Sequence, residues 1–237
     1  MKIVVFTAHP ADSIIGVGGT LAKYAQEGHD VVDVCATIGQ ALRPDMNPDD
    51  VGRIRETERL TAAKILGYSD VRNMGYRDTE LPYNRRVVGE ITEIVRAERP
   101  DIVMTYWWQN VHPDLRNLSR AVSDALIFAA FYFPSQLPTW NVKKLYVFSS
   151  LNSVNWDPEF YIDITDHIEQ KRQALQELTL VDELIREWEG PASTGLADQI
   201  ISQNRQYGLY SSVPYAEAFR EFFAVETKSR ALKHLPI

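Results

Sequence analysis

The sequence has little cysteine, no long apolar run and a deficit of positive charge. Its 237 residues include one cysteine, Cys35, which excludes an internal disulfide and makes a reducing cytoplasm the expected location. No stretch approaches the roughly 20 apolar residues of a membrane helix, and the apolar run at residues 3–6 is far too short for a signal peptide. A net charge of -7 without a basic run argues against nucleic acid or an anionic membrane as the main partner.

The apolar residues predict an α/β fold. Their share of the sequence, 45%, is sufficient for a sizeable core. Four runs without polar alternation are typical of parallel strands buried on both faces. They lie at residues 2–7, 31–37, 101–108 and 144–149. Segments of helical periodicity separate these runs, so we expect a Rossmann-like, doubly wound, mostly parallel sheet with helices on both faces.

After residue 150 the predicted strands and helices no longer alternate regularly. Residues 155–165 (NWDPEFYIDIT) predict a strand at the sheet edge, and residues 166–188 predict one long charged helix. No linker rich in Gly, Ser or Pro divides the chain. We therefore expect one domain over residues 1–237, with the core in 1–150 and a C-terminal elaboration in 151–237.

Polar side chains follow three of the predicted strands. His9 and Asp12 follow the first strand, Asp78 follows a strand near residue 75, and His112 and Asp114 follow the strand at 101–108. Ligands bind outside the carboxyl ends of the strands in open α/β sheets. These five side chains are therefore expected to converge at one edge of the sheet.

The stretch AHPADS contains His9 and Asp12, an imidazole and a carboxylate of the kind that bind Zn²⁺. The alternative is that Asp12 caps the next helix while His9 bonds to backbone. The nearby Gly16, Gly18 and Gly19 lack a Walker lysine and the dinucleotide spacing. Close backbone packing is the favoured explanation for these glycines.

The pair His112 and Asp114 admits two explanations. The carboxylate can raise the pKa of the imidazole and orient it for acid–base work. The alternative is a helix-entry turn in which Asp114 is the N-cap. Asp78 can hold a substrate hydroxyl or cap its loop, and Trp108 can stack on a sugar ring or simply lie at the rim of the core. The spacing of Arg55 places it on a solvated helix face.

The order of these clusters resembles the LmbE-like, or PIG-L, family of deacetylases. The family opening A-H-P-D-D-E, with a glycine pair and a helix, corresponds here to AHPADSIIGVGGTLA. The family helix R-x-x-E…A-A…L-G corresponds to RETERLTAAKILG, and the loop G-x-x-D to GYRD. The strand with H-P-D-H corresponds to RPDIVMTYWWQNVHPDL, and D-I-T…K to DITDHIEQK. The resemblance covers nearly the whole chain.

This resemblance implies a Zn²⁺-dependent removal of an N-acetyl group from an amino sugar or a related small conjugate. It implies His9 and Asp12 as metal ligands, and His112 as a general acid oriented by Asp114. A metal in such a site polarises the amide and lowers the pKa of its bound water. A homo-oligomer is also common in the family.

Two departures from the family pattern fall on its chemistry. Ala11 stands where the family has its general base, and Leu115 stands where it has its third metal ligand. A zinc site with only two protein ligands falls short of the usual three, so we expect His112 to complete it. The resemblance also implies that Arg55 and Asp78 lie near the substrate.

Three hypotheses follow from this pattern. The first is a metal-dependent deacetylase with a rebuilt site, in which Asp114 or Asp78 replaces the missing base. The second is hydratase or lyase chemistry on a small keto-acid, which an Ala at the base position resembles. The third is a non-catalytic member that binds a small ligand or a partner chain.

Overall fold

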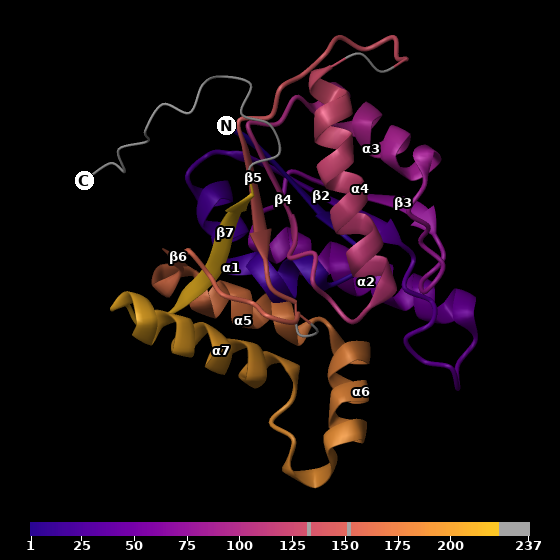
Figure 1. Ribbon diagram of the computed structural model, residues 1–237. Helices are drawn as coiled ribbons and strands as arrows, with labels where there is room; N and C mark the ends of the chain where they lie inside the picture. The colour runs from indigo at the N-terminus through magenta and orange to yellow at the C-terminus, as the bar shows by residue number, and fades with distance from the viewer. Residues whose placement is uncertain (132–133, 151–152, 223–237) are drawn as a thin grey trace.

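A seven-stranded sheet forms the centre of the computed structural model, which describes residues 1–131, 134–150 and 153–222 (Figure 1). The strand order is β3-β2-β1-β4-β5-β7-β6. The first five strands run parallel, whereas β7 is antiparallel to both of its neighbours. The strands are β1 (Lys2–Thr7), β2 (Asp30–Thr37), β3 (Asp70–Tyr76), β4 (Ile102–Tyr106), β5 (Lys144–Phe148), β6 (Phe160–Asp163) and β7 (Ala216–Phe222).

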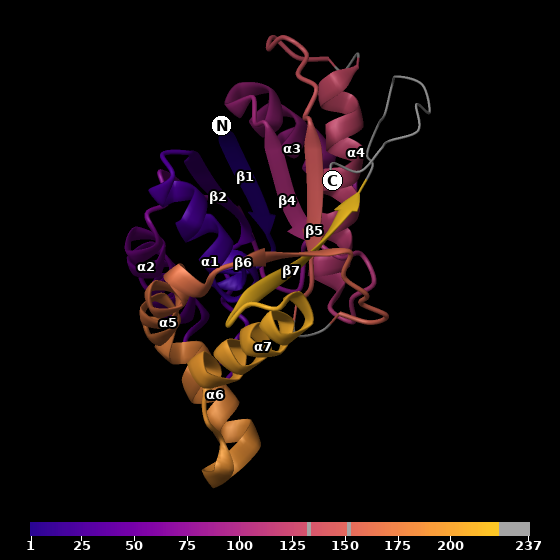
Figure 2. The same cartoon turned by 90° about the vertical axis from the view of Figure 1, so that its left-hand side faces the viewer.

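Helices cover both faces of this sheet. Figures 1 and 2 show α3 and α4 on one face, and α1, α2, α5 and α7 on the other. The helices are α1 (Asp12–Gln26), α2 (Pro48–Leu66), α3 (Arg85–Glu98), α4 (Pro113–Ala130), α5 (Ile168–Gln176), α6 (Thr179–Glu189) and α7 (Leu196–Ser211). Residues 3–6 of β1 are fully buried because both faces are covered. The doubly wound architecture is therefore confirmed.

The C-terminal elaboration adds β6 and β7 to the sheet. The predicted edge strand is confirmed, since β6 is the last strand in the order. The single long helix expected at residues 166–188 is wrong. The chain leaves helical geometry at Leu178 (φ -85°, ψ 57°), whose side chain is buried, and this break separates α5 from α6. In the described ranges, none of the helices combines the length and the apolar character needed to cross a bilayer.

The glycines of α1 allow close packing, as expected. A Cβ atom on Gly16 would lie 2.6 Å from the ring of Phe148, and one on Gly19 would lie 2.7 Å from Ile164. The helix is also kinked at Val17 (φ -140°, ψ 16°). Glycine therefore lets α1 approach β5 and the segment after β6, which brings its first turn to the sheet edge.

A buried ion pair ties the C-terminal elaboration to this kink. The carboxylate of Glu217 in β7 accepts hydrogen bonds from the backbone amides of Gly19 (2.9 Å) and Thr20 (2.8 Å). It also accepts one from the ammonium group of Lys171 in α5 (2.6 Å), and neither side chain is more than 1% exposed. The pair thus caps the second half of α1 and fixes it against two C-terminal elements.

Candidate functional site

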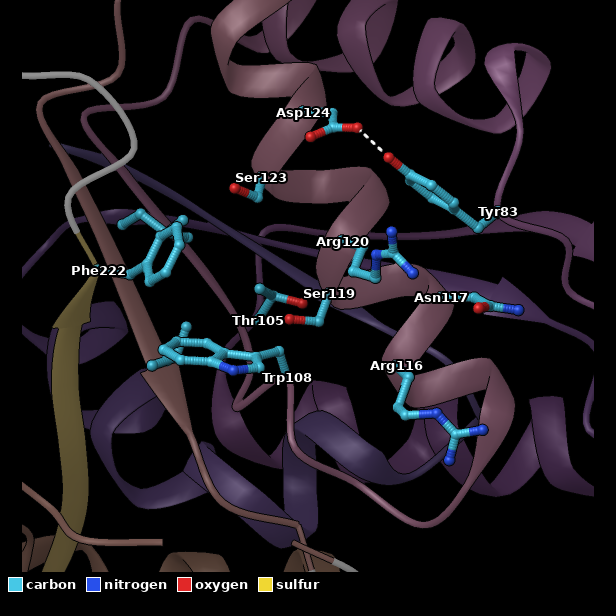
Figure 3. Close-up of a pocket in the computed structure, with 12 residues that line it drawn as sticks. Tyr83, Thr105, Trp108, Arg116, Asn117, Ser119, Arg120, Ser123, Asp124 and Phe222 are labelled. Atoms are coloured by element: carbon cyan, nitrogen blue, oxygen red, sulfur yellow. Dashed lines mark hydrogen bonds between the residues drawn. The ribbon is translucent and has the colours of Figure 1, made fainter. Parts of the chain in front are cut away.

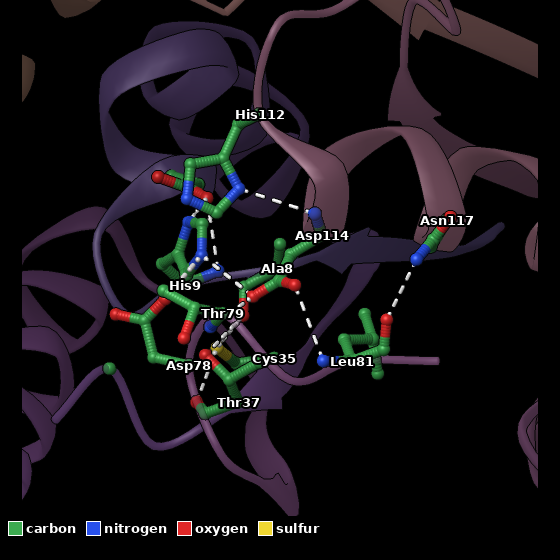
Figure 4. A network of polar contacts seen from close by, with 12 residues as sticks. Ala8, His9, Cys35, Thr37, Asp78, Thr79, Leu81, His112, Asp114 and Asn117 are labelled. Carbon is green, nitrogen blue, oxygen red and sulfur yellow. Dashed lines mark hydrogen bonds and ion pairs between the residues drawn. The ribbon is translucent and has the colours of Figure 1, made fainter. Parts of the chain in front are cut away.

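The polar cluster lies where the topology of the sheet reverses. β1 pairs with β2 on one side and with β4 on the other, so the connections leave β1 and β4 in opposite directions. Ligands of doubly wound sheets bind at the carboxyl ends of strands at such a point. His9 follows β1, Asp78 follows β3, and His112 precedes α4. Figure 4 shows these side chains pointing toward one another, which confirms the expected convergence.

The ring of His9 is held by Asp12. The backbone amide of His9 donates to Oδ2 of Asp12 (3.0 Å), and Nδ1 of the ring lies 3.2 Å from the same oxygen. That oxygen also accepts a hydrogen bond from the hydroxyl of Tyr106, which in turn accepts one from the amide of Ala8 (2.9 Å). A carboxylate bound to one ring nitrogen fixes the orientation of the other. Nε2 of His9 thus points into the cluster, where it is buried.

Two further carboxylates face Nε2 of His9. Oδ1 of Asp78 lies 3.0 Å from it, and Oδ2 of Asp114 lies 3.4 Å from it. Burial disfavours the charged imidazole, but Asp12, Asp114 and Asp78 outweigh burial and raise the pKa of His9 well above its ordinary value. Burial likewise opposes ionisation of Asp78, but His9 and Arg55 lower the pKa of its carboxyl below the ordinary value.

Backbone amides hold Asp114 in place. Its side chain is 1% exposed and accepts hydrogen bonds from the amides of Thr79 (2.7 Å) and Leu81 (3.2 Å). Asp114 is therefore not the N-cap of α4, and that alternative is wrong. The N-cap is His112, whose Nδ1 accepts a hydrogen bond from the amide of Asp114 (3.2 Å). Burial and the neighbouring His9 lower the pKa of His112, so its imidazole is neutral near pH 7.

The donor atoms in this cluster fit a divalent metal. One ligand atom each from His9, His112 and Asp114 lie within 4.8 Å of one another. Two imidazole nitrogens and one carboxylate oxygen form a ligand set that Zn²⁺ accepts. Coordination through Nε2 of His112 would place the ring proton on Nδ1 and give up the N-cap hydrogen bond. Asp12, also expected as a metal ligand, is outside this group of three, and its Oδ2 lies 3.2 Å from Nδ1 of His9.

The charge of the cluster also favours a divalent metal. Three carboxylates, those of Asp12, Asp78 and Asp114, surround His9, and among the described residues Arg55 is the cation beside them, at 3.7 Å from Asp78. With both imidazoles neutral, two negative charges stay uncompensated in a buried setting. A divalent cation would balance them, whereas a protonated His9 would balance only one.

Arg55 is a positioning residue and does not lie on a solvated face. Only 5% of its side chain is exposed, because α2 turns this side of the helix toward the sheet edge. Its guanidinium donates to the carbonyl oxygens of Gly39 (2.9 Å) and Pro10 (2.7 Å). It therefore holds the loop after β2 against the loop after β1, while facing Asp78.

Two residues of the site carried no usable sequence signal. Gln40 exchanges two hydrogen bonds with the backbone of Asp78 (2.9 and 3.2 Å), which fixes the loop that carries this carboxylate. Tyr106 supports Asp12 from the end of β4. A tyrosine in an apolar strand predicts core packing, and a lone glutamine in a loop predicts nothing specific.

The two positions that depart from the family pattern are both apolar and buried. Ala11 is 2% exposed, has a backbone φ of 108°, and belongs to an apolar cluster with Leu196 and Ile200 of α7. Leu115 is 4% exposed and lines a cavity of about 100 Å³ together with His9 and other residues at the sheet edge. Position 11 is thus filled by apolar packing, and Leu115 forms part of the wall of the cavity.

Trp108 lies away from this cluster. It is 38% exposed and lines a separate cavity of about 520 Å³ between α4 and the sheet, with Phe222 and Arg120 (Figure 3). Its ring packs on Trp107, whose side chain faces inward, so the chain turns Trp108 toward α4 as it leaves β4. The expected contact between Trp108 and a substrate at His9 therefore has no support from this geometry.

Known proteins resemble the chain in both sequence and fold. The family model PIG-L, described as GlcNAc-PI de-N-acetylase, matches residues 4–126. The chain is 31% identical to the diacetylchitobiose deacetylase of Thermococcus kodakarensis over 92% of its length and 82% of that protein. The N,N'-diacetylchitobiose deacetylase of Pyrococcus horikoshii superposes with a TM-score of 0.81 at 27% identity, over 94% of this chain and 84% of that one.

A hydratase also has this fold. The 4-carboxy-2-hydroxymuconate hydratase of Pseudomonas putida superposes with a TM-score of 0.81 over 99% of each chain, but at 20% identity, so this likeness concerns the fold alone. The family match spans the segment from β1 to α4, which delivers His9, Asp78, His112 and Asp114 to one edge. The chain therefore belongs to the PIG-L family, whose model is described as GlcNAc-PI de-N-acetylase.

Proposed function

We propose that this protein is a metal-dependent hydrolase that removes the acetyl group from an N-acetylated amino sugar or a related small conjugate. The observation that supports this most strongly is the convergence of His9, His112 and Asp114, with ligand atoms within 4.8 Å, beside a cavity at the sheet edge. Two of the similar proteins named above are diacetylchitobiose deacetylases.

In this proposal His9, His112 and Asp114 would hold a zinc ion. When bound, such an ion polarises an amide carbonyl and lowers the pKa of a bound water. Asp12 keeps Nε2 of His9 directed into the cluster, and two backbone amides keep Asp114 from turning away. These contacts preorganise the ligands, which reduces the cost of assembling the site on binding.

The proton acceptor in this proposal is Asp78. The methyl group of Ala11 cannot take a proton, and Asp114 is engaged by two amides. The carboxylate of Asp78 lies 3.0 Å from Nε2 of His9, is 8% exposed and is ionised near pH 7. Removing a general base typically lowers the rate by about 10²- to 10⁴-fold.

The test is acetate release from N-acetylglucosamine and N,N'-diacetylchitobiose by zinc-loaded protein. We expect a chelator to abolish turnover and added zinc to restore it. Asp78→Asn should lower kcat by about 10²-fold or more. Asp198→Asn, on the exposed surface of α7, serves as the matched control and should leave kcat unchanged.

Two outcomes would count against this proposal. If zinc-loaded protein binds these sugars but releases no acetate, the protein is a non-catalytic ligand-binding member. If it instead hydrates a small keto-acid, the resemblance in fold to the hydratase extends to chemistry.

A further inference from the structure

The cavity at the site has one polar side and one apolar side. Its volume is about 100 Å³. The polar part of its lining consists of His9, Asp12, His112, Ser150 and Tyr106, and the apolar part consists of Ile15, Gly16 and Leu115. From this division we infer that Leu115 and Ile15 form an acyl pocket that limits the hydrolysed group to acetyl or propionyl. The inference rests on the proposed hydrolase function and names the acyl specificity of the same site.

The apolar walls come from the first turns of two helices. Ile15 lies in the first turn of α1, and Leu115 lies in the first turn of α4 with 4% of its surface exposed. The start of α4 is held in place, because the side chain of Asp114 accepts hydrogen bonds from the amides of Thr79 and Leu81. A carbonyl group directed at His9 and His112 would thus place its alkyl end against Leu115 and Ile15.

The cavity has no room to expand behind Gly16. The ring of Phe148 packs so closely against this residue that a Cβ atom would lie 2.6 Å from it. Phe148 is itself 1% exposed and belongs to the main core. Well-packed cores accept little extra volume, so the cavity cannot enlarge by displacing this ring.

The volume of the cavity favours a short acyl chain. A cavity of about 150 Å³ lined by apolar side chains holds benzene, with its six carbon atoms. By the same measure a cavity of about 100 Å³ holds about four non-hydrogen atoms. Acetyl has three such atoms and propionyl has four, whereas butyryl has five. The branched end of Leu115 contributes three carbon atoms that Leu115→Ala would remove.

The test compares N-acetyl, N-propionyl and N-butyryl glucosamine as substrates of wild-type and Leu115→Ala protein. Each extra methylene in a tight pocket costs about 10- to 200-fold in kcat/KM. We expect wild type to prefer acetyl over butyryl by about 100-fold or more, and Leu115→Ala to reduce that preference by about tenfold or more. Leu118→Ala, at a buried position on the same helix that does not line the cavity, should leave the preference unchanged.

A binding measurement separates this inference from the proposed function. Acetate and butyrate are titrated calorimetrically into both proteins, which requires no turnover. Leu115→Ala should bind butyrate at least about tenfold more tightly than wild type does. If no substrate is hydrolysed, the proposed function fails while the titration still decides on the pocket. Equal butyrate affinity in the two proteins, or an unchanged acyl preference, would overturn the inference.

Discussion

Ala11→Asp tests whether position 11, where the resemblance implies a general base, accepts a carboxylate in this chain. A pocket that has merely lost one side chain would accept the carboxylate without loss of stability. The structure predicts otherwise, because Ala11 is 2% exposed and belongs to the apolar cluster with Leu196 and Ile200. The change would therefore place a carboxylate among apolar side chains.

The magnitude follows from the burial. A fully buried carboxyl group has its pKa raised by up to about 3–5 units, and each unit corresponds to about 1.4 kcal/mol. The ionised form of Ala11→Asp should thus cost about 4–7 kcal/mol, a large part of the roughly 5–15 kcal/mol that stabilises a typical domain. Asp tolerates the positive φ of this position better than Ala does, but that gain is only about 1 kcal/mol.

The sign of the pH dependence follows from the raised pKa. Between the unfolded pKa, about 3.9, and the raised folded pKa, the native state of the variant binds more protons than the unfolded state. The destabilisation is therefore small below about pH 4 and grows as the pH rises. Urea unfolding followed by tryptophan fluorescence at pH 5 and pH 8 measures it, with Ala11→Asn as the uncharged control. Equal stability of the two variants at pH 8 would refute the reasoning, because position 11 would then face the polar cavity.

Three further predictions concern the metal site and the core. Leu115→His should raise zinc affinity by about tenfold or more in calorimetric titration, because it adds a nitrogen donor to the cavity wall, whereas Leu115→Met should not. Glu217→Gln should lower the free energy of unfolding by about 3–5 kcal/mol in urea, because it leaves the buried ammonium of Lys171 unpaired; an effect below about 1 kcal/mol would contradict this. Zinc affinity should fall as the pH drops below the raised pKa of His9, because binding must displace its proton; calorimetry in buffers of different ionisation enthalpy should show that proton, and a pH-independent affinity would contradict this.

Strand patterning predicted most of the fold. Residues 3–6 of β1 are buried on both faces, and their uninterrupted apolar pattern predicted that. The break at Leu178 was not predictable, because a leucine has high helix propensity and the break depends on its burial in tertiary packing. The amides that follow the kink at Val17 donate to the carboxylate of Glu217, about 200 residues further along the chain, and no local pattern contains that partner.

The sequence predicted where the site lies in the fold. It did not predict which side chains of the site contact one another. The convergence of His9, Asp78 and Asp114 follows from their places after parallel strands. The roles within the cluster depend on differences of a few tenths of an ångström between contact distances. The contact between Asp12 and Nδ1 of His9 is one example. The burial of Arg55 was missed because the helix periodicity does not tell which side faces the sheet edge.

The measurement that tests the central claim most directly is the zinc content of purified protein after saturation with zinc and exhaustive dialysis. We expect about one zinc ion per chain for wild type and less than about a tenth of that for His112→Asn. Asparagine is also a favourable N-cap residue, so we expect α4 to stay intact in that variant. Wild-type protein that retains no zinc, or a His112→Asn variant that retains as much as wild type, would contradict the account.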